Sequence, residues 1–259
     1  MRQLLVERYA AGSTCPGRMR LTVMTARAGD RRGCQGGGSV TDRTVRLGGL
    51  AGVIFVILIL ITIFAGGSMP KPDDSVLKIQ KYFVDHRRGL LFTNFAGIVA
   101  IPFALWFGVV LRELVRRDRL ASLYGTGLLS GLLVAASMAL AGGALEATPV
   151  YVSGAAQKYD PNLLRLVFDA QTLAFIATSA GILAFAAASA VAIRRSEVLP
   201  AYTMWLAALA VVGNAVTMIS ALGARLSAIG IFGVATFGIF ILVTGITMAA
   251  GKATIDAAA

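Results

Sequence analysis

Histidine and cysteine are nearly absent from this 259-residue chain, which narrows the chemistry open to it. His86 is the single histidine, so one chain cannot supply a bis-histidine haem or a histidine-rich metal site. Cys15 and Cys34 both lie before residue 40. The remainder of the chain therefore has no thiolate ligand, disulfide or cysteine nucleophile.

Charged residues are also scarce, at 14% of the chain against 57% hydrophobic residues, and the mean hydropathy is +0.76. The net charge of +11 comes from basic residues that flank apolar runs instead of lining one soluble face. Residues 1–39 alone carry seven arginines against Glu7 and Asp30, a net charge of +5. This distribution is typical of membrane topology, and we expect no nucleic-acid partner.

Recognisable catalytic and cofactor motifs are missing as well. The sequence contains neither a phosphate-binding glycine-rich loop with lysine nor an H-E-x-x-H zinc pair. His86 follows Asp85, but no serine or cysteine nucleophile stands at a recognisable spacing from it. We therefore predict a non-enzymatic protein without catalytic residues, cofactors or metal ligands, and a membrane-embedded enzyme is the least favoured class.

What the chain does contain is a series of long apolar runs. Residues 47–65 carry no charge, and a helix rising 1.5 Å per residue needs about 20 such residues to cross a bilayer. The pattern predicts an all-α, polytopic transmembrane bundle over residues 40–250, followed by a short tail at 251–259. The six expected spans are about 47–66, 89–111, 121–145, 167–193, 201–222 and 227–250.

Residues 1–39 do not fit this pattern. They are rich in glycine and arginine and lack the apolar core of a signal peptide. One interpretation is a disordered basic tail beside anionic lipid head groups. The other, which we favour, is upstream sequence from a misplaced start, with initiation near Met24 or Val40.

The connections after the second and fourth spans are short and basic. The positive-inside tendency places them, and hence both termini, in the cytoplasm of a multi-pass plasma-membrane protein. Interfacial aromatic residues near the same ends of the spans favour this orientation. The residues concerned are Arg112, Arg116, Arg117, Arg119, Arg194 and Arg195, with Trp106, Tyr124, Tyr202 and Trp205.

Both longer outer connections contain helix signals. Between residues 74 and 88, apolar residues recur at helical spacing with charged residues opposite, which predicts a short amphipathic outer helix or an outward extension of the second span. In the other connection, Asp160 and Pro161 form a helix start. A helix from there to Arg195 is about 52 Å long, so its first turns must stand outside the hydrocarbon.

Small residues recur every fourth position in the third and fourth spans. Such stripes let helix backbones approach closely, which predicts a tight hairpin of these two spans or, less favoured, a surface for another membrane protein. The predicted packing residues are Gly127, Gly131, Ala135, Ala139, Gly143, Ala180, Ala184 and Ala188, and Ala192 continues the second stripe.

Polar residues within the spans form the last candidate group. Glu146 and Asp169 stand at the outer interface, where they either hold a cation or a shared proton or are solvated or paired with Arg165, Arg225 or Lys158. The uncharged residues bond neighbouring helices or line a cavity. The candidate polar cavity comprises Asn94, Glu146, Asp169, Gln171, Asn214 and Thr217.

The order of segments resembles that of small six-helix actinobacterial membrane proteins grouped as a domain of unknown function. The resemblance rests on VRLGGLAG, PKPDDSVLKIQKYFVDHR, FDAQTLAF and VLPAYTMWLA and covers roughly residues 40–250. It implies a helical bundle without catalytic residues to carry over. By analogy, small polytopic proteins of this kind are candidates for accessory subunits of the lipid-import machines of mycobacterial envelopes.

The leading hypothesis is an accessory or scaffolding subunit of a cell-envelope complex, with the lipid bilayer and another membrane protein as partners. The alternative is a small transporter or lipid-binding protein that uses a polar cavity open to the outer face. A transporter requires a polar cavity that reaches the midplane, whereas a scaffold is expected to have a dry core of small residues.

Overall fold

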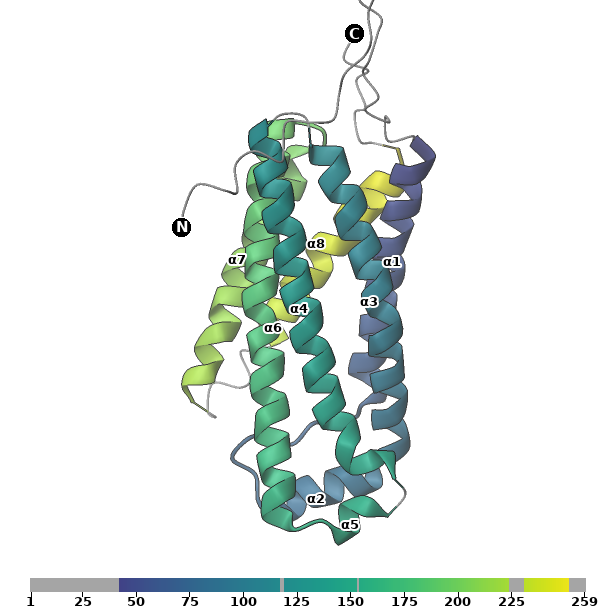
Figure 1. Ribbon diagram of the computed structural model, residues 1–259, viewed down its shortest axis with the longest axis vertical. Coiled ribbons are helices and arrows are strands. Elements are labelled where there is room, and N and C mark those ends of the chain that lie inside the picture. Colours follow the sequence, from purple (N-terminus) through teal and green to yellow (C-terminus); the bar gives the residue numbers. More distant parts are fainter. Residues whose placement is uncertain (1–41, 117–118, 153, 224–230, 252–259) are drawn as a thin grey trace, which may run out of the picture. The chain divides into compact units, whose positions relative to one another are not determined.

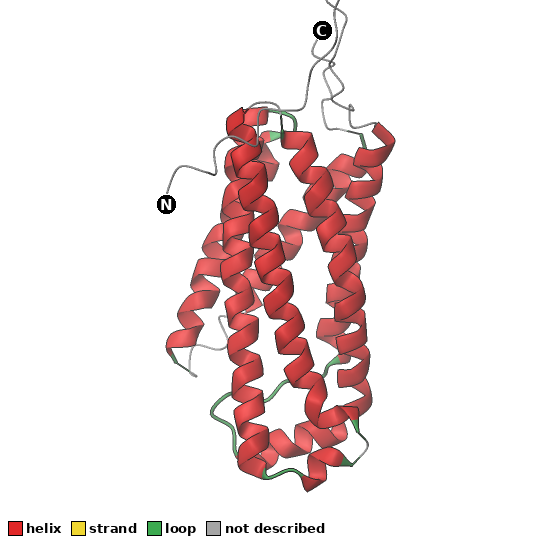
Figure 2. Cartoon of the chain, in the orientation of Figure 1, coloured by secondary structure: helices red, strands yellow, loops and turns green. Residues whose placement is uncertain are grey.

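A computed structural model describes residues 42–116, 119–152, 154–223 and 231–251, which belong to one compact unit (Figure 1). In these ranges every regular element is helical (Figure 2). The elements are α1 (Asp42–Ala65), α2 (Val76–Asp85), α3 (Arg87–Val115), α4 (Arg119–Tyr151), α5 (Ala155–Lys158), α6 (Pro161–Ser196), α7 (Ala201–Ile219), η1 (Ser220–Leu222) and α8 (Ile231–Ala249).

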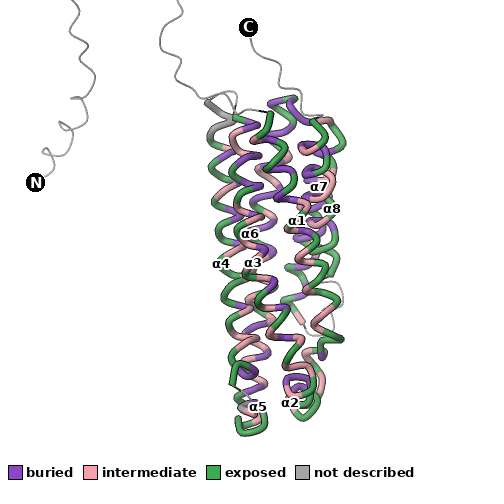
Figure 3. The backbone as a smooth tube through the Cα atoms, turned by 90° about the vertical axis from the view of Figure 1, so that its right-hand side faces the viewer, coloured by how far each residue is buried: buried purple, intermediate pink, exposed green. Residues whose placement is uncertain are grey.

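The predicted all-α bundle with six spans is confirmed, because six of these helices are long and apolar enough to cross a membrane. Each packs against the next along the chain, and α8 returns to α1, so the six form a closed ring. Much of each span remains exposed, with only 28% of the apolar window of α1 buried (Figure 3). The predictions for residues 1–39, Arg117, Arg225 and 252–259 lie outside the described residues.

The six helices differ in length. At 1.5 Å per residue, α7 and α8, with 19 residues each, are about 29 Å long, close to the hydrocarbon thickness of a bilayer. The 33 residues of α4 and the 36 of α6 make these helices about 50 and 54 Å long. We call the end with Arg112, Arg116, Arg194 and Arg195 the basic end.

The long helices extend beyond α7 at the opposite end, where α2 and α5 cover them (Figures 1 and 3). We call this region the cap. It has its own hydrophobic cluster, the cap core, separate from the membrane core that the six long helices share. The cap core consists of Ile79, Tyr82, Phe83, Leu90, Val150, Ala156, Leu164 and Phe168.

The amphipathic segment predicted at 74–88 is a separate helix and not an extension of the second span. Ile79, Tyr82 and Phe83 form its buried face, and the charged residues opposite are exposed. The backbone leaves helical geometry at His86, where φ is −100° and ψ is 12°, and α3 begins at the next residue. The turn at His86 lets α2 fold across the bundle end and bury its apolar face.

The predicted start of α6 is also confirmed. Pro161 is the first helical residue, and the Asp160 side chain accepts a hydrogen bond from the Asn162 backbone N–H at 2.7 Å. This bond satisfies one of the free N–H groups at the helix start. The helix then continues unbroken to Ser196, so the cap and the membrane bundle share one rigid element.

The hairpin of α4 and α6 is packed through two glycines. A Cβ atom at Gly131 would lie 2.5 Å from the backbone nitrogen of Phe185, and one at Gly181 would lie 2.6 Å from the Gly131 carbonyl oxygen. Ala135 completes the crossing opposite Gly181. Backbone contact of this kind is what small residues permit between membrane helices.

The predicted stripes match this interface only in part. On α6, the side chains of Ala180 and Ala184 are exposed, because the buried face of the helix is rotated by one residue. Gly181 faces α4 instead, and Ala184 contributes only its backbone, 3.0 Å from where a Cβ at Gly131 would lie. A Cβ atom built at Gly127 would lie 3.6 Å from the Cβ atom of Ala188, and Ala192 is buried. On α4, Gly127 is exposed, Ala139 is partly buried and Gly143 faces α3.

Candidate functional site

A layer of polar residues separates the two hydrophobic cores. Along α3, α4 and α6 the chain passes from cap core to membrane core through Asn94, Glu146 and Gln171, respectively. We call these three residues the polar layer. At 1.5 Å per residue, Asn94 lies about 27 Å from Arg112 and Gln171 about 35 Å from Arg194, so the layer is at the head-group level of the cap side.

The packing of α4 against its neighbours sets the register of this layer. The Asn94 amide nitrogen donates a hydrogen bond to the Gly143 carbonyl oxygen, which ties α3 to α4. On the other side, a Cβ at Gly142 would lie 3.0 Å from the Phe175 ring. Because α4 and α6 are antiparallel, one further turn brings Glu146 level with Gln171.

Among the described residues, Gln171 and Glu146 have no hydrogen-bond or ion-pair partner. Gln171 is fully buried, and neither polar atom of its amide has a hydrogen-bond partner among the described residues. The carboxylate of the partly buried Glu146 forms no ion pair or hydrogen bond within the same ranges. A buried polar group without a partner costs about 1–3 kcal/mol and calls for an explanation.

Tyr82 of α2 lies beside the polar layer. Its hydroxyl donates to the carbonyl oxygen of Gly66, just after α1, at 3.3 Å, and its ring is 5.1 Å from that of His86. Burial raises the pKa of the Tyr82 phenol, and the nearby Glu146 carboxylate raises this pKa further. The phenol therefore stays neutral and keeps the proton that it donates to Gly66.

Asp169 is outside this layer and has a different task. Arg165, one turn earlier on α6, binds both of its carboxylate oxygens, with Nε at 2.9 and 3.1 Å. The same guanidinium donates to the carbonyl oxygens of Asp74, at 3.0 Å, and Pro72. Of the expected partners of Asp169, Arg165 is thus the one used, and together they hold the segment before α2 onto α6.

Asn214 and Thr217, the remaining members of the predicted cavity, pack α7 against α8. The Asn214 amide donates to the carbonyl oxygens of Ala210 and Gly233, and the Thr217 hydroxyl accepts from the Gly233 N–H at 3.0 Å. A Cβ at Gly233 would collide with the Thr217 hydroxyl. These bonds tie α7 to α8, while the buried Asn214 side-chain oxygen has no hydrogen-bond partner among the described residues.

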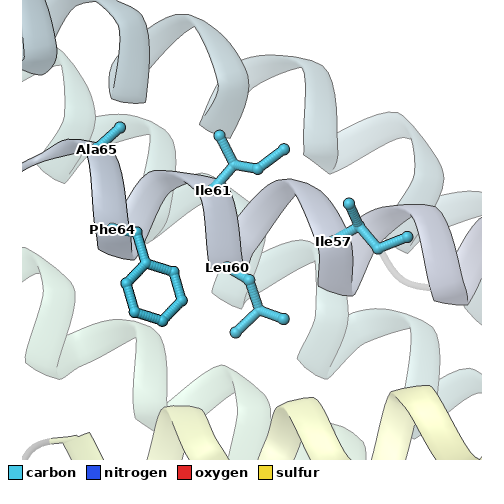
Figure 4. Close-up of a pocket in the computed structure, with 5 residues that line it drawn as sticks. All are labelled: Ile57, Leu60, Ile61, Phe64 and Ala65. Atoms are coloured by element: carbon cyan, nitrogen blue, oxygen red, sulfur yellow. The ribbon is translucent and has the colours of Figure 1, made fainter.

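A shallow, open apolar surface lies on the cap-side half of α1. Leu60 and Phe64 project from α1 toward the side where α8 runs, and Phe64 is 81% exposed (Figure 4). The residues that line this surface are Ile57, Leu60, Ile61, Phe64 and Ala65.

No group of three or more histidine, cysteine, aspartate or glutamate side chains comes together in the described ranges. This finding concerns only part of the chain, so the absence of a metal or cofactor stays a prediction. No protein-family model matches the sequence, and neither a curated protein nor a solved structure is significantly similar to it. Fold and apolar helices together define the class: an integral, multi-pass α-helical membrane protein.

Three contributors to this region were not among the predicted site residues. Gly181 is the sole glycine of α6, and that isolation in an alanine-rich helix is the signal that indicates a crossing point. Tyr82 stands at helical spacing beside Ile79 and Phe83, which indicates burial. Arg165 was considered only as a partner of Asp169, because sequence carries no signal for its bonds to a distant loop.

We expect Gln171→Met to raise the free energy of unfolding by about 1–3 kcal/mol, since a similarly shaped apolar side chain removes an unsatisfied amide. Asn94→Leu is the matched control. It removes an amide that is bonded to Gly143, so we expect it to lower stability. Unfolding of both variants in detergent without added lipid measures the difference, and a loss of stability in Gln171→Met contradicts the interpretation.

Proposed function

We propose that this protein is a non-enzymatic accessory or scaffolding subunit of a cell-envelope complex. It crosses the plasma membrane six times, with both termini in the cytoplasm and the cap outside. The orientation rests on the short arginine-rich connections at the basic end, which the positive-inside tendency favours in the cytoplasm. Its partners are the lipid bilayer and a larger membrane protein or complex.

The observation that carries this proposal is the closed centre of the ring. Phe185 packs against Phe237 and Phe240, with ring centroids 5.9 and 6.1 Å apart, and Phe55 packs against Phe237 at 6.1 Å. Phe185 is about 14 Å from Arg194 along α6, which is mid-membrane depth. A packed aromatic centre at this depth supports a structural role over a polar transport route.

The cap supplies the surface for a partner. Leu163 and Leu166, in the first turns of α6, are 47% and 65% exposed. Leu166 lies about 42 Å from Arg194 along the helix, beyond a hydrocarbon core of about 30 Å. These two leucines lie one helical turn apart, and we take them as the apolar surface that the partner covers.

The test is affinity purification of the tagged full chain at native expression level in mild detergent, read by quantitative mass spectrometry. Stoichiometric recovery of a larger membrane complex supports the proposal, whereas a lone monomer or homo-oligomer contradicts it. The Leu163→Gln/Leu166→Gln double variant is expected to reduce recovery of the partner at least tenfold, a loss of about 1.4 kcal/mol. Lys158→Gln, an exposed residue of the same connection, is the control.

A further inference from the structure

Glu146 stands between α3 and α6, and the packing of α4 fixes this direction. A Cβ at Gly142 would lie 3.0 Å from the Phe175 ring of α6. A Cβ at Gly143 would lie 3.0 Å from the Asn94 amide nitrogen of α3. Residues three and four positions apart share a helix face, so Glu146 follows both glycines by one turn. Its carboxylate therefore lies between the two helices that flank α4.

The register of the α4–α6 hairpin places Gln171 opposite Glu146. The two helices are antiparallel, and Gly142 meets Phe175. One turn further along each helix, four residues on, lie Glu146 and Gln171. The crossing at Gly181, nearer the membrane centre, has the same register, which therefore holds over several turns.

A proline adds a backbone oxygen to this face of α4. Pro149 lies inside the helix and has no N–H, so the Leu145 carbonyl lacks the donor that an unbroken helix supplies. Pro149 is buried and is two turns beyond Gly142, on the face that packs against α6. The carbonyl oxygen of Leu145 is directed along the helix toward Pro149, next to Glu146.

The cations of the neighbouring helices are used elsewhere. Arg87, two turns before the polar layer on α3, donates to the Tyr151 carbonyl oxygen at 3.2 Å. Arg165 of α6 binds Asp169. Within the described ranges, the Glu146 carboxylate has no ion-pair partner.

The neutral groups of the layer offer oxygen atoms. The Asn94 amide uses its nitrogen for the Gly143 carbonyl, and no described residue donates to its oxygen. The fully buried Gln171 has an unpartnered amide oxygen. Together with Glu146 and the Leu145 carbonyl, they make a set of oxygen atoms that calls for a positively charged occupant.

We propose that the polar layer binds one sodium ion, held by the Glu146 carboxylate, the Gln171 and Asn94 amide oxygens and the Leu145 carbonyl oxygen. Oxygen atoms are the ligands that hard cations take, and one carboxylate balances a single charge, whereas calcium loops draw on several carboxylates. Backbone carbonyls freed at breaks in membrane helices coordinate sodium in transporters.

The ion links α3, α4 and α6 where the cap core meets the membrane core. It needs no protein partner, so it is independent of the accessory-subunit proposal. It departs from the expectation that the chain has no metal ligands, which rested on histidine and cysteine. The gain in stability expected of Gln171→Met applies in sodium-free solution, because the ion stabilises only the chain that retains the amide.

Sodium binding is tested on the full chain, purified in mild detergent without sodium. Binding of radioactive sodium is measured at constant ionic strength, with choline chloride as the balancing salt. We expect saturable binding of one ion per chain and a higher unfolding temperature as sodium replaces choline. Unlabelled sodium displaces the label, and choline does not, because its methyl groups keep the charge away from the oxygens. No saturable binding, or equal displacement by choline, overturns the proposal.

Two variants remove side-chain ligands. Glu146→Gln and Gln171→Met are each expected to weaken sodium binding by about tenfold or more, as loss of a contact to a charged group implies. Asp85→Asn and Gln157→Met, at exposed positions of α2 and α5, are the matched controls and leave the sodium affinity unchanged. An unchanged sodium affinity in either folded ligand variant overturns the proposal.

Pro149→Ala tests the backbone ligand. The substitution restores an N–H donor to the Leu145 carbonyl, so we expect weaker sodium binding without a loss of stability in sodium-free solution. Pro102→Ala is the matched control, because Pro102 also lies inside a helix but frees a carbonyl elsewhere on α3. Its sodium affinity is expected to equal that of the unmodified chain. An equal affinity in Pro149→Ala as well overturns the proposed ligand set.

Discussion

Gly181→Ala is expected to lower the free energy of unfolding by about 3 kcal/mol, the upper range for overpacking. The added methyl group would meet the backbone of Gly131 and Ala135, not the end of a flexible side chain. The backbones of α4 and α6 must separate to make room, which also loosens the packing around Phe185. Reversible unfolding in mixed micelles measures the change.

Gly238→Ala in α8 is the matched control for this substitution. A Cβ at Gly238 meets nothing within 4 Å, so only the helix propensity changes, in favour of alanine by up to about 1 kcal/mol. We expect Gly238→Ala to be neutral or slightly stabilising. If both alanine variants behave alike, the close crossing of α4 and α6 is not what holds the hairpin.

Arg165→Ala is expected to release the cap from the bundle while the membrane core stays folded. The substitution removes the bonds to Asp169 and to the carbonyl oxygens of Asp74 and Pro72. Hydrogen bonds to charged groups contribute about 1.5–3 kcal/mol each to stability, and the loss falls on the segment before α2. Hydrogen exchange of residues 70–88 is expected to accelerate at least tenfold, with exchange in α7 and α8 unchanged.

Lys78→Ala provides the control for the cap. Lys78 forms an exposed ion pair with Asp74 at 2.8 Å, and exposed pairs of this kind add little to stability. The Lys78 side chain and the Lys71 backbone N–H hold the pKa of Asp74 below its usual range, so the pair is intact at neutral pH. Exchange in Lys78→Ala that matches Arg165→Ala contradicts the special role of Arg165.

The fold was predictable because its determinants are local. The uncharged run after Leu47, the helix start at Asp160 and Pro161, and the amphipathic spacing around Ile79 each act within a few residues. Length and hydropathy alone define a span in a bilayer. The helical number and order follow directly from these signals.

The candidate site was less predictable because it depends on packing between distant segments. The proposed cavity contains six polar residues, but Asp169 is bound to Arg165, while Asn214 and Thr217 bind within the α7–α8 pair. Which of two adjacent small residues meets a neighbouring helix depends on the rotation of that helix, and Gly181 replaces Ala180 and Ala184 for this reason. Sequence spacing does not specify this rotation.

The return of α8 to α1 has a topological consequence. A Cβ atom built at Gly251 would lie 3.3 Å from a guanidinium nitrogen of Arg46. The two ends of the described bundle are therefore neighbours. The ring has no intrinsic first helix. A circular permutant that joins residue 251 to residue 42 by a short linker and opens between α6 and α7 would preserve every helix–helix interface, so connectivity and packing are separable in this fold.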